Sequence, residues 1–136
     1  MSTGARARLV LIVEDDESTG DVLAEALNDE RGYRALRVAS ADEALDALGR
    51  VDPDLLLLDI RLPGMSGLEL YDHIKADDRF RAIPVVFETG GGREHAEALR
   101  ERGVATYVKK PFDVDEVVQF VKRLVPPLNG HARRTA

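Results

Sequence analysis

Five short apolar runs alternate along the chain with stretches in which apolar residues recur at helical spacing. The runs cover residues 9–13, 33–38, 55–58, 83–87 and 104–108. Short apolar runs separated by amphipathic helices are typical of βαβ units, in which buried parallel strands alternate with crossover helices. The pattern therefore predicts an α/β fold, a doubly wound parallel sheet of five strands covered by helices on both faces.

The first two helices have recognisable end signals. Val22, Leu23, Ala26 and Leu27 recur at helical spacing in the first helix, and Gly32 is placed to end it. The second helix opens with a capping-box sequence over residues 40–43 and is expected to stop at residue 49, which is a glycine.

The last three helices differ in how strongly the apolar pattern and the end signals in the sequence predict them. The third follows Gly67, with apolar positions at residues 68, 70, 71 and 74. The fourth, over residues 93–102, has a weak apolar face and is expected to be the loosest. The fifth begins after Asp113 as N-cap, carries a stripe of valines and ends at the proline pair 126–127.

Length and composition narrow the class of protein. A chain of 136 residues predicts one domain, over residues 8–125, with short flexible tails at 1–7 and 126–136. The net charge of −6 argues against direct binding to nucleic acid, and the lack of cysteine excludes disulfides and thiolate metal sites. The apolar stretch 9–13 is too short for a signal peptide or membrane span, so we expect a cytoplasmic protein without membrane contact.

Charged side chains stand where three of the predicted strands end. Glu14 and Asp15 follow the first run, Asp59 follows the third, and Lys110 comes soon after the fifth. In an open parallel sheet, ligands bind at the carboxyl edge where the strand order reverses, which for the order 2-1-3-4-5 lies between strands one and three. We therefore expect three carboxylates and an ammonium to meet at this edge.

This group of charges suggests a phosphoryl site with a metal ion. Three neighbouring carboxylates repel one another unless a proton or a cation is present, and an all-oxygen set favours Mg²⁺. A carboxylate can also attack phosphorus, with Lys110 as the ammonium that neutralises charge. Thr89, after the fourth run, offers a hydroxyl to a phosphoryl oxygen, and Gly90 leaves room for a backbone amide to approach it.

Four motifs in order resemble the receiver domain of bacterial response regulators, over about residues 8–125. They are 13–16 (VEDD), 58–67 (LDIRLPGMSG), 89–90 (TG) and 109–112 (KKPF). The resemblance implies the flavodoxin-like receiver fold with strand order 2-1-3-4-5. It also implies a signalling switch, not a conventional enzyme, in which Asp59 accepts a phosphoryl group from a histidine kinase or a phosphotransfer protein.

The resemblance assigns a role to each site residue. Glu14 and Asp15 would hold Mg²⁺ with Asp59 and the backbone carbonyl of Arg61, and Lys110 would pair with the phosphoryl group. Thr89 would be the switch hydroxyl and Tyr107 the switch aromatic. The family usually has a cis peptide between this lysine and Pro111, where proline makes the cis form accessible.

The same resemblance implies partners for the switch. A downstream effector protein would bind the surface formed by the fourth helix, fifth strand and fifth helix. A stand-alone receiver would act as a monomer or as a dimer that forms on phosphorylation.

Two features depart from the family pattern. Position 88 is usually apolar in receivers and is a glutamate here, and the glycine run 90–92 predicts a mobile loop after the fourth strand. Arg61 and Gly91 occupy positions at the entrance to the site, where they are expected to influence how fast the acyl phosphate hydrolyses.

Other interpretations remain open at this point. The chain could be a receiver-fold interaction module that works without phosphorylation, although its acidic pair and lysine are intact. A flavodoxin-like electron carrier would need a phosphate-binding loop after the first strand, where this chain has acids. The three histidines, at 73, 95 and 131, lack metal-ligand spacing and are expected to face water.

Overall fold

The computed structural model describes residues 6–128 and contains one five-stranded parallel sheet. Most of the two predicted tails, 1–7 and 126–136, lies outside the described residues. The strands lie side by side in the order β2-β1-β3-β4-β5, which confirms the predicted doubly wound topology. Their bounds are β1 Arg8–Val13, β2 Tyr33–Val38, β3 Leu55–Asp59, β4 Val85–Thr89 and β5 Tyr107–Lys109.

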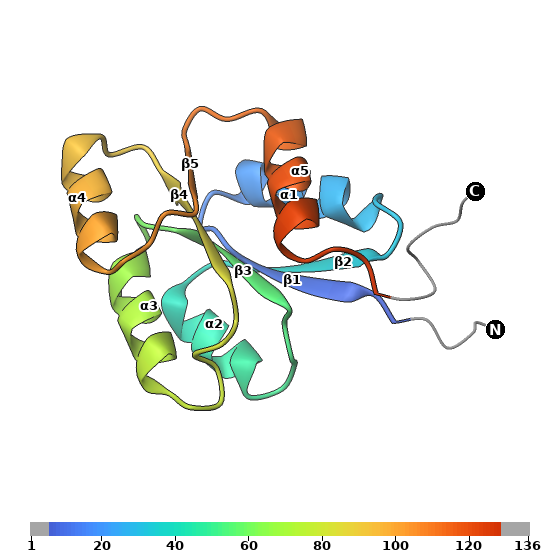
Figure 1. The fold of residues 1–136 in the computed structure, drawn as a ribbon, viewed down its shortest axis with the longest axis horizontal. Coiled ribbons are helices and arrows are strands. Elements are labelled where there is room, and N and C mark those ends of the chain that lie inside the picture. Colours follow the sequence, from blue (N-terminus) through green and yellow to red (C-terminus); the bar gives the residue numbers. More distant parts are fainter. Residues whose placement is uncertain (1–5, 129–136) are drawn as a thin grey trace.

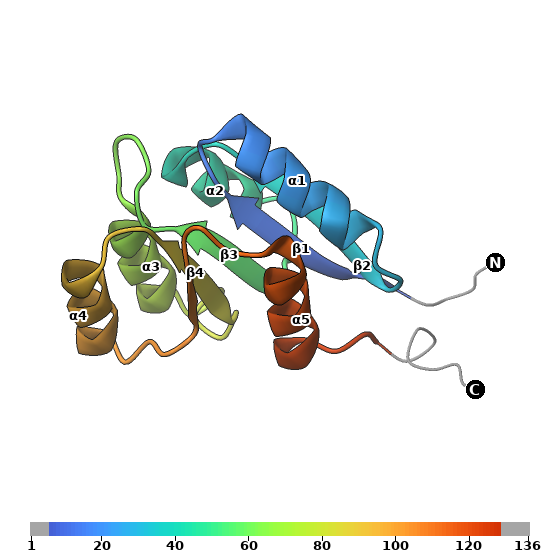
Figure 2. The same cartoon turned by 90° about the horizontal axis from the view of Figure 1, so that it is seen from above.

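Five helices cover both faces of the sheet (Figure 1, Figure 2). They are α1 Glu17–Asn28, α2 Ala41–Leu48, α3 Gly67–Ala76, α4 Arg93–Glu101 and α5 Val114–Leu124. Helices α1 and α5 lie on one face, and α2, α3 and α4 pack on the other. Right-handed crossovers between parallel strands produce this arrangement, because the chain moves outward in both directions from β1.

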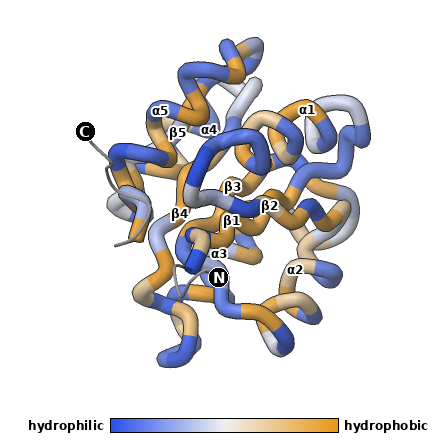
Figure 3. The backbone as a smooth tube through the Cα atoms, turned by 90° about the vertical axis from the view of Figure 1, so that its right-hand side faces the viewer, coloured by the Kyte–Doolittle hydropathy of each residue, from blue (hydrophilic) through white to orange (hydrophobic). Residues whose placement is uncertain are grey.

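Alternation of side chains along the strands divides the core into two layers. In β3, Leu55 and Leu57 pack with α1 and α5, while Leu56 and Leu58 pack with α2, α3 and α4. Figure 3 shows these apolar strands at the centre, with the polar stretches around them. Since both faces are covered, β3 and β4 are buried along their whole length.

The last two strands begin later than the apolar runs predict. Ile83 and Pro84 precede β4, since proline has no amide to give to a ladder. Val104 packs against the core, but its amide closes the end of α4 by donating to Leu99, so the fifth run pairs only from Tyr107. Here apolar character reflects packing and not strand pairing. Strand β4 also extends through Thr89, one residue beyond the predicted end of the fourth strand at Glu88.

Two predicted details of the early helices are wrong. Helix α1 ends at Asn28 with Asp29 as its C-cap, and Gly32, at a φ of 89°, lies in the turn before β2. Val22 is 49% exposed, because the face of α1 that packs on the sheet is formed by Leu23 and Leu27 with Ala24 and Ala26.

The predicted N-caps are present, with one variation. Asp113 caps α5 by accepting a hydrogen bond from the Asp115 amide. Ser40 accepts from the Glu43 amide, but the Glu43 carboxylate accepts from Ala39 instead of closing the box on Ser40. The full capping box is on α3, between Ser66 and Glu69.

Within residues 6–128, none of the helices combines the length and the apolar character that a membrane span requires. Helix α4 is the least embedded of the five: only Leu99 is buried, and Gly92 at its N-cap supplies no side-chain cap.

Candidate functional site

Four ionisable side chains form a row across the carboxyl edge of the sheet, on the face covered by α1 and α5. The residues two positions earlier on β1, β3, β4 and β5 all point into the core of that face. Because side chains alternate along a strand, the residues at the strand ends follow the same direction. The row consists of Glu14, Asp59, Glu88 and Lys110.

Lys110 contacts two of the carboxylates that the sequence predicts at this edge, those of Asp59 and Glu14. Its Nζ lies 2.8 Å from Asp59 Oδ2 and 3.5 Å from Glu14 Oε1. Partial burial alone would lower the pKa of Lys110, but the hydrogen bond to Asp59 and the surrounding carboxylates outweigh burial and raise it. The side chain is therefore a permanent ammonium at this edge.

Asp59 is the last residue of β3 and is only 4% exposed. Its Oδ1 accepts a hydrogen bond from the Arg61 amide at 3.0 Å, and its Oδ2 accepts from Lys110. A buried aspartate with both oxygens aligned by donors is a positioned carboxylate and not a solvated turn residue. Arg61 contributes through its amide here, and a role for its carbonyl as a metal ligand stays a prediction.

The acidic pair and Asp59 form a cluster suited to a cation. One carboxylate oxygen from each of Glu14, Asp15 and Asp59 lies within 4.8 Å of the others. Burial, the largest influence, raises the pKa of Glu14, and the charge of Asp59 adds to it. Close carboxylates with only oxygen donors match the preference of Mg²⁺, and the exposed Asp15 leaves one side open to water. The cluster therefore fits the metal ion predicted from the sequence.

Glu88 is the unexpected member of the row, because it is fully buried on β4, where it pairs across the sheet with Asp59. Burial, the neighbouring carboxyl of Glu14 and the charge of Asp59 raise the pKa of Glu88 to about 9. Among the described residues, no other group donates a hydrogen bond to Glu14 Oε1 or to either oxygen of Glu88. With this pKa the carboxyl of Glu88 carries a proton at neutral pH, and that proton is the donor available to the neighbouring Glu14 carboxylate.

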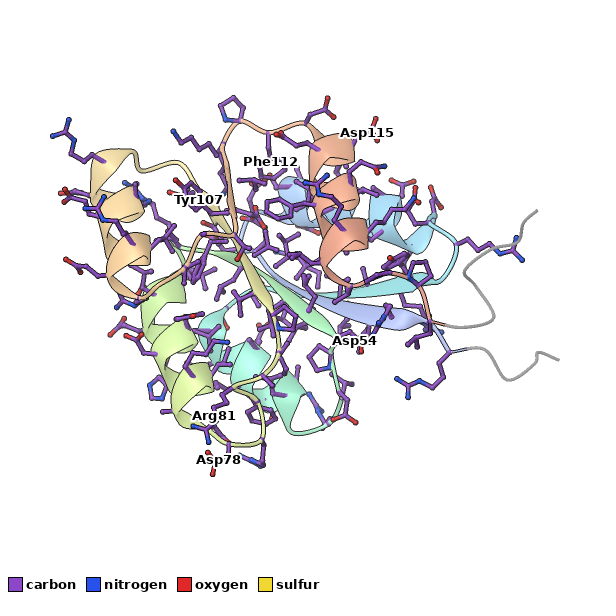
Figure 4. The ribbon with its side chains drawn as sticks, in the orientation of Figure 1. Asp54, Asp78, Arg81, Tyr107, Phe112 and Asp115 are labelled. Carbon is purple, nitrogen blue, oxygen red and sulfur yellow. The ribbon has the colours of Figure 1, made fainter. Side chains whose placement is uncertain are left out.

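Thr89 ends β4, and its side chain belongs to the opposite face of the sheet, that of Phe87. A hollow of about 190 Å³ opens beside it, lined also by Gly90, Ala96 of α4 and Tyr107. In Figure 4, Tyr107 lies between β5 and α4. The structure thus places the predicted switch pair at one pocket, and the role of the pair stays a prediction.

One of the three histidines lies at this edge, which contradicts the expectation that all face water. His95 Nδ1 is 2.6 Å from the Thr89 hydroxyl. The position follows from the first turn of α4 folding back over the glycine run, a tertiary contact that no sequence spacing signals. His73 is exposed as expected, and His131 lies outside the described residues.

A larger hollow of about 540 Å³ lies at the mouth of the site. Its walls include Asp15, Arg61 and His95, together with apolar residues of the loop between β3 and α3. Asp15 of the acidic cluster is one of these walls, and the position of Arg61 at the entrance to the phosphorylation site stays a prediction.

Sequence reasoning missed a residue that supports the acidic pair. The Arg37 side chain on β2 packs against Gly20 of α1, and its Nε donates to the Glu14 carbonyl at 2.9 Å. Gly20 of α1 makes room for it, since a Cβ there would lie 2.6 Å from Arg37 Nε. A glycine inside an otherwise regular helix was the only signal in the sequence.

Asp16 and Lys109, which neighbour Asp15 and Lys110 in the sequence, are not members of the row. Asp16 is the N-cap of α1 and accepts from the Thr19 amide at 2.9 Å, and Lys109 is exposed. The Lys110–Pro111 peptide is cis, as the family resemblance implies.

Comparison with known proteins gives consistent matches. The family model described as response regulator receiver domain matches residues 10–122. Sporulation initiation phosphotransferase F of Bacillus subtilis is 36% identical over 118 residues, which cover 86% of this chain and 93% of the relative. The polar-differentiation response regulator DivK of Brucella abortus is 36% identical over 114 residues, covering 83% and 92%.

A solved structure shares the whole fold. The signal receiver domain of a signal transduction histidine kinase from Syntrophus aciditrophicus superposes with a TM-score of 0.80 at 29% identity, over 96% of each chain.

Proposed function

Because the chain belongs to the response regulator receiver domain family, we propose that it is a stand-alone receiver that accepts a phosphoryl group on Asp59. The donor is a sensor histidine kinase or a histidine phosphotransfer protein. The observation that carries the proposal is the buried Asp59 held 2.8 Å from Lys110, next to the acidic pair Glu14 and Asp15. The Bacillus relative is named as a phosphotransferase, which agrees with this chemistry.

The transfer follows from the groups around Asp59. A carboxylate oxygen of Asp59 attacks phosphorus while the P–N bond of the donor phosphohistidine breaks, and the imidazole keeps the electron pair and takes a proton. Lys110 neutralises the growing charge on the phosphoryl oxygens, a form of electrostatic stabilisation that needs no rearrangement. The Arg61 amide holds the other oxygen of Asp59 and so fixes the attacking carboxylate.

Glu14, Asp15 and Asp59, with the Arg61 carbonyl, would hold the Mg²⁺ that the reaction requires. When bound, the ion supplies charge neutralisation and aligns the phosphoryl group with the carboxylate. Arg61 and Gly91 lie at the entrance and influence the rate at which the acyl phosphate hydrolyses.

Phosphorylation acts by shifting the balance between two arrangements. The phosphoryl group binds Lys110 and the Thr89 hydroxyl in only one of them, and Tyr107 changes its burial in the pocket that Thr89 vacates. The affected surface, formed by α4, β5 and α5, binds a downstream effector protein. The receiver works in the cytoplasm, as a monomer or as a dimer that phosphorylation induces.

Incubation with acetyl phosphate and Mg²⁺ is expected to add one phosphoryl group to the intact protein, as measured by mass spectrometry. Asp59→Asn removes the attacking oxygen, and a chelator removes the metal, so neither sample should gain mass. If the wild-type protein gains nothing and also fails to bind beryllofluoride, the phosphorylation-independent interaction module becomes the better account.

A further inference from the structure

The hydroxyl of Thr89 is held between two groups in this structure. His95 Nδ1 lies 2.6 Å from it, and the Gly91 amide donates to it at 3.2 Å. Thr89 itself is only 4% exposed, so water does not compete freely for the hydroxyl. The hydroxyl is therefore fixed toward α4, on the face of the sheet opposite to that of Asp59.

Gly91 makes the contact with His95 possible. A Cβ at position 91 would overlap Nδ1 and the neighbouring carbons of the His95 ring. The ring thus occupies the space that a side chain at residue 91 would fill, and it reaches the wall of the hollow shared with Asp15 and Arg61. The lack of a side chain at Gly91 therefore leaves room for the imidazole of His95.

A hydrogen-bond count shows what this contact does to the hydroxyl. A threonine hydroxyl has one proton and two acceptor sites. If Nδ1 is the acceptor, the single proton is already used. If Nδ1 carries hydrogen, the oxygen is anchored by two donors, Nδ1 and the Gly91 amide. In the first tautomer the proton is unavailable to a phosphoryl group until the contact breaks. In the second the proton is free, but His95 and the Gly91 amide hold the oxygen toward α4, so the hydroxyl turns to a phosphoryl group on Asp59 only after the contact with His95 breaks.

We propose that His95 is a positioning residue that holds Thr89 in the unphosphorylated protein and competes with the phosphoryl group for it. This inference rests on the function proposed above. It also explains how phosphorylation would affect α4. Breaking the contact frees the first turn of this helix, which has Leu99 as its buried residue and lacks a side-chain N-cap. His95 thereby opposes the active arrangement and lowers the affinity of the site for a phosphoryl group.

The test is the affinity for beryllofluoride with Mg²⁺, measured by titration calorimetry. His95→Phe keeps a ring over Gly91 but removes the hydrogen bond, and should bind about 3- to 10-fold more tightly, the range that one hydrogen bond of ordinary net strength gives. His95→Asn keeps a polar group near the position of Nδ1 and should stay close to wild type. His73→Phe, on the exposed side of α3, is the matched control and should change nothing.

A double-mutant comparison separates the proposed competition from a general effect on α4. In a Thr89→Val background, His95→Phe should have no further effect on affinity. An unchanged or weaker affinity in the single variant, or an effect that persists without the hydroxyl, overturns the inference while leaving the phosphoacceptor role of Asp59 intact.

Nuclear magnetic resonance of the resting protein tests the contact independently of phosphoryl chemistry. The Nδ1 nitrogen shift of His95 should change in Thr89→Val, and an unchanged shift means that the contact is absent. If the shift changes but wild-type protein neither binds beryllofluoride nor accepts phosphate, the proposed function itself fails, and the competition with it.

Discussion

Replacement of Glu88 by glutamine is expected to stabilise the metal-free protein at neutral pH and to reduce the dependence of stability on pH. Glutamine has nearly the same shape and keeps a donor for the Glu14 carboxylate, but it never carries a charge. The wild-type carboxyl must stay protonated in the fold, with its pKa raised from 4.5 to about 9 by burial and by Glu14.

The direction of the effect follows from proton binding. Below pH 4.5 the carboxyl of Glu88 is protonated in both the folded and the unfolded chain, and the full stability is present. Between pH 4.5 and about 9 the unfolded chain releases this proton while the folded protein retains it, so the free energy of unfolding falls as pH rises. At pH 7 the loss amounts to roughly 3 kcal/mol, which Glu88→Gln should recover in large part.

Urea unfolding from pH 5 to pH 8, in buffer with a chelator, provides the measurement. Glu25→Gln is a matched control, since Glu25 is exposed on α1 and the chemical change is the same. The control should follow the wild-type profile. If the Glu88→Gln profile runs parallel to that of the wild type, or lies below it at pH 7, Glu88 does not carry a proton in the fold.

Glu88 also shows how far the sequence alone reaches. The residue was recognisable as a departure from the family pattern at the end of the fourth strand, but nothing in the sequence indicated that its carboxyl is fully buried. Its burial depends on β4 starting two residues later, after Pro84, and on pairing with Asp59 across the sheet. This register depends on pairing with the neighbouring strands, and the intrinsic strand propensity of the residues does not determine it.

The sheet order and the main site could be predicted because they depend on position along strands. Asp59 and the acidic pair stand at the ends of apolar runs, and a parallel sheet brings such ends together whatever the loops do. Contacts made by long side chains from other elements escaped prediction. Arg37 reaches Glu14 from β2, and His95 reaches Thr89 from α4.

The start of α3 could have been predicted more completely. Ser66 and Glu69 have the spacing of a capping box, and the structure contains both of its hydrogen bonds. The sequence placed a helix after Gly67 but gave no indication that Gly67 itself touches the strand carrying Asp59. That approach depends on the path of the loop from residue 60 to residue 66, which is closed by the Gly67 amide donating to the Ile60 carbonyl.

Gly67→Ala is accordingly expected to destabilise the protein by about 3 kcal/mol or more, at the upper end of the cost of overpacking. A Cβ at this position would overlap the Asp59 carbonyl oxygen and lie 2.9 Å from Ile60 Cα. These are backbone atoms of the last residue of β3, the central strand, and of the residue that follows it, so the helix has to move instead. The small gain in helix propensity from alanine cannot offset such a clash.

Gly49→Ala is the matched control for this substitution. Gly49 ends α2 with a φ of −77°, and the nearest atom to an added Cβ is the Asp46 carbonyl oxygen at 3.4 Å. Its free energy of unfolding should change by less than about 1 kcal/mol, because alanine fits this conformation and restricts the unfolded chain. Both variants are compared by denaturant unfolding.

The functional consequence of Gly67→Ala separates a local shift from a general loss of stability. Moving α3 away from β3 pulls on the loop whose Arg61 amide aligns Asp59. Phosphoryl incorporation from acetyl phosphate should therefore fall even at a temperature where the variant remains folded, whereas Gly49→Ala should incorporate as much as wild type. Normal incorporation in a folded Gly67→Ala protein would show that the alignment of Asp59 does not depend on where α3 begins.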